Sequence, residues 1–272
     1  MIFFNLNNEK QIPALGLGTY RTTNNNDVEN SIKAALDSKF TLIDTAAVYG
    51  NENEIGDALK KLNSRRENLF ITSKVWNSDQ GYDSTLKAFE KSLKKLQTDY
   101  LDLYLIHWPF FSSKMTETWR AFERMYEEGV VKNIGVSNFH KHHLEKLFTT
   151  ANIVPAVNQI ELHPYLTQVE LREFCKKHGI IIESWSPIAK GRVSEDKLLQ
   201  EIGKKYGKTA VQVTLRWHIQ LGLVAIPKSV NPERIAQSID IFNFELTAEE
   251  MQQINNLNKN MRVGPDPDNF DF

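Results

Sequence analysis

Four polar side chains stand at or near the ends of apolar runs of strand length, and together they could carry out acid catalysis on an oxygen atom. Asp44, Lys74 and His107 each end such a run, and Tyr49 follows Asp44 in the loop that leads into the next helix. Taken alone, three of them have plainer explanations. Asp44 could cap a helix, Lys74 could extend to solvent, and His107 could be a hydrogen-bonded core histidine. Their shared placement at strand ends indicates a common site.

The four residue types fit the protonation of a carbonyl oxygen. A tyrosine has an ordinary pKa of about 10, which is too high for ready proton donation at neutral pH, and a neighbouring ammonium would lower this pKa. Because a buried ammonium is costly without a counter-charge, Asp44 is the expected partner of Lys74. His107 could then orient the carbonyl, and Tyr49 would act as a general acid worth about 10²–10⁴ in rate. No nucleophile is evident, so the second reactant must come from a cofactor.

The elements that position these residues alternate between strand-like and helical patterns. Strand-like runs cover 15–18, 41–44, 69–74, 101–107, 134–136, 156–160, 180–183 and 223–226. Amphipathic helical patterns cover 27–38, 52–62, 84–96, 116–127, 141–149, 168–177, 209–220 and 232–239. Eight such units in about 250 residues predict a (β/α)8 TIM barrel with buried parallel strands, and a doubly wound sheet is the alternative. Barrel active sites form at the carboxyl ends of the strands.

Both ends of the chain add to this barrel. Residues 3–13 predict a β-hairpin around Asn7-Asn8, which we expect to act as a lid on one end of the barrel. An extra helix is expected over 247–257, with Thr247 as N-cap and Glu250 in the capping-box position. The tail 263–272 has two prolines and little periodicity, and we expect an extended arm. We expect residues 1–272 to form a single domain.

Composition excludes several classes of function. The 272 residues carry 33 Lys+Arg against 34 Asp+Glu, so neither nucleic acid nor a membrane surface has electrostatic support as a partner. The single cysteine, Cys175, excludes an internal disulfide and fits a reducing compartment. The apolar residues 1–4 are too few for a signal peptide, and no run approaches a membrane span of about 20 residues. We expect a soluble cytoplasmic protein.

Four local motifs do not support a site of their own. The segment 16–21 lacks the third glycine of a dinucleotide-binding fingerprint, and Ser137 lacks the closing glycine of a nucleophile elbow. The histidines at 140, 142 and 143 open a predicted helix without nearby acidic ligands, so we interpret them as a solvated helix start and expect no metal. Cys175 lies in a predicted helix and is interpreted as a packed structural thiol.

Eight segments in order along the chain resemble the aldo-keto reductases. They are GLGTY at 16–20, DTAAVYGNE at 44–52, KVW at 74–76, LYLIHWP at 103–109, IGVSNF at 134–139, NQIE at 158–161, ESWSP at 183–187 and IPKS at 226–229. The resemblance covers roughly 10–265, and it is greatest to the bacterial glyoxal, methylglyoxal and 2,5-diketo-D-gluconate reductases. It implies reduction of aldehydes or ketones with NADPH as cofactor.

Site residues carry over position by position. The resemblance gives Tyr49 the role of general acid, Asp44 and Lys74 that of the pair that tunes it, and His107 that of orienting the substrate. It assigns the nicotinamide amide to Ser137, Asn138 and Gln159, ring stacking to Trp185, and the adenosine 2′-phosphate to Lys228, Ser229 and Arg234. Other expected cofactor contacts are Gly18, Thr19, Ser186 and Gln237. Ser238 stands where many relatives have Asn, which leaves the adenine contact open.

The expected substrate pocket is aromatic and open. The resemblance places Tyr20, Trp76 and Trp108 on its walls beside His107, and Phe110, Phe270 and Phe272 are further candidates. The connection at 110–115 is short, which predicts an open pocket and broad specificity for small carbonyl compounds.

Two alternatives remain open at this point. The chain could be a cofactor-binding regulatory subunit of the same fold, as potassium channel β-subunits are, or a barrel enzyme that uses Lys74 as a Schiff-base amine. Relatives of this kind are often monomers, and no heptad run argues otherwise, so we expect a monomer.

Overall fold

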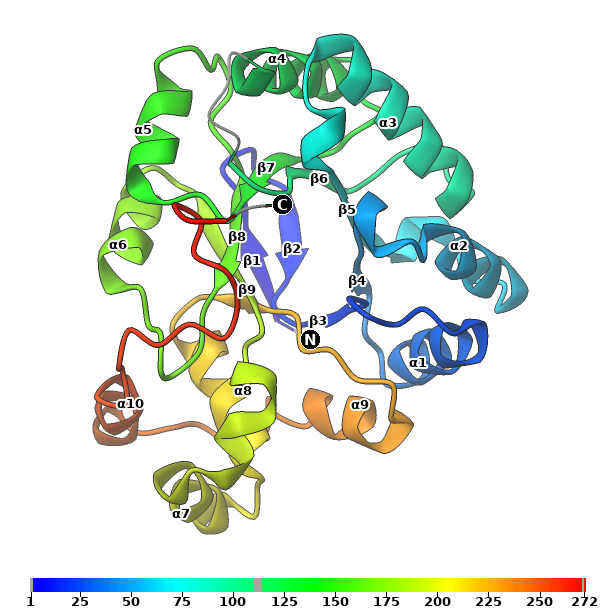
Figure 1. Ribbon diagram of the computed structural model, residues 1–272. Helices are drawn as coiled ribbons and strands as arrows, with labels where there is room; N and C mark the ends of the chain where they lie inside the picture. The colour runs from blue at the N-terminus through cyan, green and yellow to red at the C-terminus, as the bar shows by residue number, and fades with distance from the viewer. Residues whose placement is uncertain (1, 110–113, 271) are drawn as a thin grey trace.

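The computed structural model describes residues 2–109, 114–270 and 272, and over these residues the chain winds into a barrel of alternating strands and helices (Figure 1). Within the described residues, eight parallel strands pair in sequential order from β3 to β10. They are β3 (Gly16–Gly18), β4 (Leu42–Asp44), β5 (Phe70–Val75), β6 (Leu103–Ile106), β7 (Ile134–Ser137), β8 (Val157–Glu161), β9 (Ile181–Trp185) and β10 (Val224–Ala225). Parallel bridges from Leu15 to Ala225 and from Gly18 to Lys228 join the first strand to the last. This arrangement confirms the (β/α)8 prediction over the doubly wound alternative.

Helices cover the outside of the strands. They are α1 (Asn25–Asp37), α2 (Glu52–Lys61), α3 (Tyr82–Leu96), α4 (Lys114–Glu127), α5 (Lys141–Phe148), α6 (Val169–Lys177), α7 (Lys197–Tyr206), α8 (Ala210–Gln220), α9 (Pro232–Ile239) and α10 (Ala248–Asn255). The apolar positions spaced three and four apart on these helices pack against the outer face of the strands, as amphipathic helices do. The capping box predicted for the last helix is present, since the Thr247 and Glu250 side chains each bond the other's backbone N–H.

One helix was missed. The predicted pattern places a single helix between β9 and β10, whereas the structure has both α7 and α8 there. Local signals for α7 exist in the sequence: the Asp196 side chain caps its start, and Gly207 ends it in the left-handed region at φ 64°.

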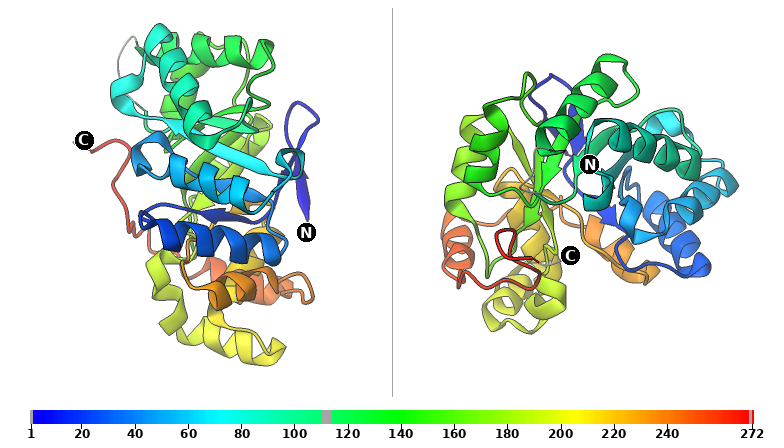
Figure 2. Two further views of the ribbon diagram at one scale, coloured as in Figure 1. Left: turned by 90° about the vertical axis from the view of Figure 1, so that its right-hand side faces the viewer. Right: turned by 45° about the horizontal axis from the view of Figure 1, so that its top comes forward.

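The N-terminal hairpin closes one end of the barrel, as predicted. It consists of β1 (Phe3–Asn5) paired antiparallel with β2 (Gln11–Pro13). Leu6 and Ile12 of this hairpin pack with the residues that fill the barrel interior: Leu42, Phe70, Leu103, Leu105, Ala156, Val157, Val224 and Ile226. The tail at 263–270 lies at the opposite end, as the left view of Figure 2 shows. The hairpin therefore leaves the carboxyl ends of the strands open for a site.

No helix over residues 2–109, 114–270 and 272 combines the length and apolar character needed to cross a membrane.

Candidate active site

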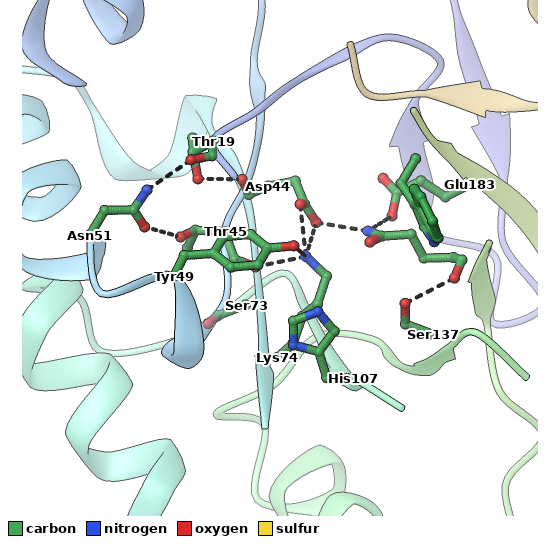
Figure 3. A network of polar contacts seen from close by, with 12 residues as sticks. Thr19, Asp44, Thr45, Tyr49, Asn51, Ser73, Lys74, His107, Ser137 and Glu183 are labelled. Atoms are coloured by element: carbon green, nitrogen blue, oxygen red, sulfur yellow. Dashed lines mark hydrogen bonds and ion pairs between the residues drawn. The ribbon is translucent and has the colours of Figure 1, made fainter. Parts of the chain in front are cut away.

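The four residues singled out from the sequence come together at the carboxyl ends of the strands (Figure 3). Asp44 is the last residue of β4, Lys74 lies in β5 one residue before its end, and His107 directly follows β6. Tyr49 ends a 3-10 turn, Ala47–Tyr49, and Gly50 follows it at φ 69°, a conformation that glycine adopts without strain. Three neighbouring strands and one turn therefore place the four side chains.

The Lys74 ammonium is the centre of this group. Its Nζ donates to both carboxylate oxygens of Asp44 at 2.7 and 2.8 Å and to the Thr45 carbonyl at 2.9 Å. The Tyr49 hydroxyl lies 3.4 Å from the same nitrogen. The Lys74 side chain is completely buried, so its charge depends on these partners. The expected pairing of Lys74 with Asp44 is present in the structure.

The pKa values in this group differ in one respect from the expectation. Burial raises the pKa of Tyr49 to about 12, although the charge of Lys74 pulls it down. The lowering by the ammonium that the sequence predicted is therefore present, but desolvation of the phenolate outweighs it and the net pKa is raised. Burial alone would lower the pKa of Lys74, but Asp44 and Tyr49 outweigh it and raise this pKa above its ordinary value. Lys74 is charged and Tyr49 protonated at neutral pH.

His107 is neutral. Burial, with the nearby charge of Lys74, holds the pKa of His107 well below its ordinary value. The ring meets Tyr49 and Trp76 edge-on, with centroids 5.5 and 5.2 Å apart. A neutral imidazole donates one hydrogen bond, so His107 can hold a carbonyl oxygen without bringing a second positive charge into the site.

A second buried carboxyl group joins the network through Gln159. The Gln159 amide nitrogen donates to Asp44 Oδ2 and to Glu183 Oε2, each at 2.7 Å. Burial, followed by the charge of Asp44, raises the pKa of Glu183 to about 8. Glu183 therefore holds a proton at neutral pH. Glu183 belongs to the segment ESWSP, but no role for it was predicted from the sequence. Its place two residues before Trp185 on one strand face was the signal that could have found it.

The residues expected near a nicotinamide ring line the same end of the barrel, on β7 to β9. Asn138, at φ 65°, donates from its amide to the His107 carbonyl and accepts from the Trp185 indole at 2.8 Å. Ser137 donates to the backbone carbonyl of Gln159 at 2.9 Å. Ser186 follows Trp185 at φ 48°. Asn138 thus fixes the plane of the indole ring.

Gly18 and Thr19 lie on the other side of the Asp44 strand. The Thr19 hydroxyl donates to the Asp44 carbonyl at 2.9 Å, and a Cβ on Gly18 would meet the Ile226 carbonyl oxygen at 2.9 Å. Asn51, to which the sequence analysis gave no role, ties this region to the Tyr49 turn. It accepts from the Thr45 hydroxyl and donates to the Thr19 carbonyl.

The residues expected around the phosphate line one cavity of about 700 Å³. Lys228, Ser229, Arg234 and Gln237 all contribute to its wall, and so does Ser238. The structure adds residues that the sequence analysis missed: Ile188, Gly191, Ser194 and Lys204. All four lie in the connection between β9 and α8, where α7 was not predicted.

The aromatic side chains expected around the substrate surround His107 and Tyr49. Tyr20 contacts the Tyr49 ring with centroids 5.0 Å apart. Trp76 stacks on Phe272 at 5.7 Å, and Trp108 contacts Phe270 at 5.0 Å. Both tail aromatics therefore join this wall, and Phe110 lies outside the described residues.

The histidines at the start of α5 open a helix, as predicted, but only His142 is largely exposed to solvent. The nearest acidic residue in sequence is Glu145, whereas the tail brings Asp268 against all three rings. Asp268 lies 2.7 Å from His140 Nδ1, 2.9 Å from His142 Nε2 and 3.3 Å from His143 Nε2. The His143 side chain is 1% exposed, so it is packed and not solvated.

Cys175 is buried, as expected, and burial raises the pKa of its thiol to about 12.

Comparisons with known proteins agree with this geometry. The model of the aldo/keto reductase family matches residues 14–259. Glyoxal reductase of Bacillus subtilis (strain 168) is 52% identical over 267 residues, which cover 98% of this chain and 96% of that protein. Methylglyoxal reductase DkgA of Escherichia coli (strain K12) is 45% identical, with coverage of 95% and 94%. A solved structure of a Gox0644 mutant in complex with NADPH superposes with a TM-score of 0.95 at 42% identity and covers 100% of this chain and 99% of that one. The chain therefore belongs to the aldo/keto reductase family and is an oxidoreductase.

Proposed function

We propose that this protein reduces small aldehydes and ketones to alcohols, 2-oxoaldehydes such as methylglyoxal among them, with NADPH as the reductant and Tyr49 as the proton donor. The observation that carries the proposal is the placement of the Tyr49 hydroxyl 3.4 Å from the buried, paired ammonium of Lys74. The names of the bacterial relatives, glyoxal reductase and methylglyoxal reductase, support the substrate class.

The side chains present fit NADPH. Lys228, Ser229 and Arg234 offer two cations and a hydroxyl along a cavity of about 700 Å³, which suits a phosphate group. Both amide hydrogens of Gln159 are used by carboxyl groups, and its amide oxygen bonds nothing within the described part of the chain. That oxygen can accept from a carboxamide N–H, and the flat face of Trp185 can support an aromatic ring. NADPH supplies the hydride for the carbonyl carbon when it is bound.

The residues of the chain supply the proton and the orientation. His107, neutral and held at the edge of Trp76, donates a hydrogen bond to the carbonyl oxygen. Tyr49 gives its proton to that oxygen as negative charge develops there. Lys74 stabilises the resulting phenolate, and Asp44 keeps Lys74 charged in its buried position. Asp44 and Lys74 therefore act through Tyr49.

The pocket favours small or apolar carbonyl compounds. Tyr20, Trp76 and Trp108 form its walls, and the tail aromatics add to one side. Apolar walls with few polar groups bind many substrates weakly, so we expect broad specificity.

The test compares wild type with Tyr49→Phe. Loss of the absorbance of reduced nicotinamide is followed with methylglyoxal, an aromatic aldehyde and a sugar-derived ketone. We expect NADPH-linked turnover that falls by about 10²–10⁴ in the variant, while NADPH affinity is unchanged. Turnover that survives in Tyr49→Phe would refute the assignment of the proton donor. Tight NADPH binding without turnover on any carbonyl would instead support the regulatory-subunit alternative.

We also propose that the protein works as a monomer in the cytoplasm. All four side chains of the site come from one chain, so a single copy can build it. Light scattering coupled to size-exclusion chromatography tests the oligomeric state.

A further inference from the structure

The C-terminal tail meets the start of α5 where three histidines lie close to a single carboxylate of the tail. His140 is the N-cap residue of α5, and His142 and His143 lie in its first turn. Asp268 comes from the tail, 128 residues after His140. In Figure 1 the tail passes beside α5 on its way to the mouth of the barrel. We call Asp268 with these three histidines the tail clasp.

In His140 and His143, the ring nitrogen that faces away from Asp268 determines where the ring carries its proton, and so what the tail clasp can bind. The Arg262 guanidinium lies 2.9 Å from His140 Nε2, and the backbone N–H of His140 donates to His143 Nδ1 at 3.0 Å. Because a guanidinium and a peptide N–H can only donate, these ring nitrogens must be acceptors. In the neutral rings the proton therefore sits on His140 Nδ1 and on His143 Nε2, which both face Asp268.

This proton arrangement argues against a metal ion. Four ligand atoms of the tail clasp lie within 4.8 Å of one another, a spacing that could hold a metal. A histidine that binds a metal normally donates its other N–H to an acceptor. Here the other nitrogen of His140 and of His143 receives a donor instead. The cluster is built to present N–H groups to a carboxylate.

The charge state of the carboxylate agrees with this reading. Partial burial would raise the pKa of Asp268, but the hydrogen bond from His140 and the nearby rings outweigh burial and lower it. Burial lowers the pKa of His143 to about 4, so this ring is neutral at neutral pH. Asp268 is thus an ionised carboxylate that accepts a hydrogen bond from His140 and lies close to the ring nitrogens of His142 and His143.

The tail clasp lies two residues before the first aromatic residue that the tail adds to the substrate wall. Two residues of chain span at most about 7 Å, so fixing Asp268 confines Phe270 to a small region. Phe270 contacts Trp108, and Phe272 stacks on Trp76 at an interplanar angle of 12°. Trp76 in turn borders His107.

A second attachment lies upstream. The Glu161 carboxylate, completely buried, accepts from the backbone N–H of Val263 and from that of Gly264 at 3.0 Å. This attachment holds the start of the tail, five and four residues before Asp268. The tail clasp lies nearer the aromatic end, where the Asn77 amide also donates to the Phe272 carbonyl at 3.3 Å.

We propose that the tail clasp positions the aromatic end of the tail as one wall of the substrate pocket, and that Asp268 thereby sets the affinity for aromatic and other bulky carbonyl substrates. The inference rests on the proposed function, because the pocket concerned is the proposed substrate pocket. Asp268 and the histidines are positioning residues, since none of them reaches His107 or Tyr49.

The test uses Asp268→Asn in the full chain. This change keeps the size of the side chain but places an amide NH₂ among N–H donors. The matched control is Glu145→Gln, an acid on α5 with 53% side-chain exposure against 45% for Asp268. We expect KM for an aromatic aldehyde to rise about three- to tenfold, the loss of one or two net hydrogen bonds. We expect kcat, NADPH affinity and the KM for methylglyoxal to stay near wild type, because methylglyoxal is too small to need the tail.

A second measurement does not depend on activity. Trypsin can cut after Lys259 and Arg262, which precede Asp268 along the chain. We expect the variant to release the C-terminal peptide faster than wild type and than Glu145→Gln, as followed by mass spectrometry. Equal cleavage rates with an unchanged KM for the aromatic aldehyde would overturn the proposal. If wild type turns over no carbonyl, the proposed function fails, and cleavage alone still tests the tail clasp.

A zinc-binding experiment tests whether the tail clasp is instead a metal site. In calorimetric titrations with Zn²⁺ we expect wild type and Asp268→Asn to behave alike, without saturable binding that depends on Asp268. Binding of that kind, with protection of the tail from trypsin, would overturn the argument from the ring protons and assign the cluster to a metal.

Discussion

The replacement Glu183→Gln should change how the stability of this protein depends on pH. Glu183 is completely buried, and its nearest polar partner is the amide of Gln159 and not a cation. Burial raises the pKa of Glu183 from an ordinary 4.5 to about 8. The folded protein therefore keeps a proton on Glu183 that the unfolded chain releases above pH 4.5.

The sign follows from this difference in bound protons. Between about pH 5 and about pH 8 the folded state holds more protons than the unfolded state, so the free energy of unfolding of wild type falls as pH rises. Each pH unit in this window costs about 1.4 kcal/mol, and two to three units give about 3 kcal/mol. Above about pH 8 the Glu183 contribution levels off. A glutamine has no proton to lose, so the variant lacks this fall.

Urea unfolding at a series of pH values measures the effect. We expect Glu183→Gln to gain about 3 kcal/mol relative to wild type between about pH 5 and about pH 8, or about 5 °C in Tm for a chain of this length. Glu201→Gln, a change at an exposed acid on α7, should give a curve parallel to wild type. Parallel curves for Glu183→Gln and wild type would refute the reasoning, because Glu183 would then ionise in the folded protein as it does in the unfolded chain.

Two further changes test the cofactor side of the site. Gly264→Ala would put a Cβ 2.3 Å from the Trp185 ring, so we expect the tail or the indole to shift, with stability lower by about 1–3 kcal/mol in urea unfolding and weaker NADPH binding in a fluorescence titration. If the stability and the NADPH affinity of Gly264→Ala equal those of wild type, the tail can shift at Gly264 without cost, and the prediction is wrong. Arg234→Ala should raise the Kd for NADPH by about tenfold, the effect of one charged contact, and leave the Kd for NADH unchanged. An equal change for both cofactors would exclude a contact between Arg234 and the 2′-phosphate.

The strands and the four central residues could be predicted because their signals are local. A strand buried on both faces is a short apolar run, and a charged residue at its end stands out from that run. Asp44 and Lys74 were found in this way, and the barrel topology alone then brings β4 beside β5. Their contact needed no knowledge of side-chain geometry.

Contacts across the barrel could not be predicted in the same way. The bond from Gln159 to Asp44 joins residues 115 apart, and the one between His140 and Asp268 joins residues 128 apart. No periodicity records such a contact, since it depends on how far the barrel curves and where the tail crosses its mouth. The histidines of α5 were assigned to solvent for this reason, because their partner lies in a segment without regular structure.

The charges of the central network explain why a tyrosine with a raised pKa suits a proton donor. In the proposed reaction Tyr49, with a pKa of about 12, keeps its proton at neutral pH until negative charge develops on a bound carbonyl oxygen. The phenolate that then forms is stabilised by Lys74, whose charge Asp44 balances. A second ionised carboxylate nearby would oppose a new negative charge on Tyr49, and the proton on Glu183 removes that opposition. The burial that makes Tyr49 a weak acid at rest also keeps Glu183 neutral, so one physical cause prepares both groups for proton transfer.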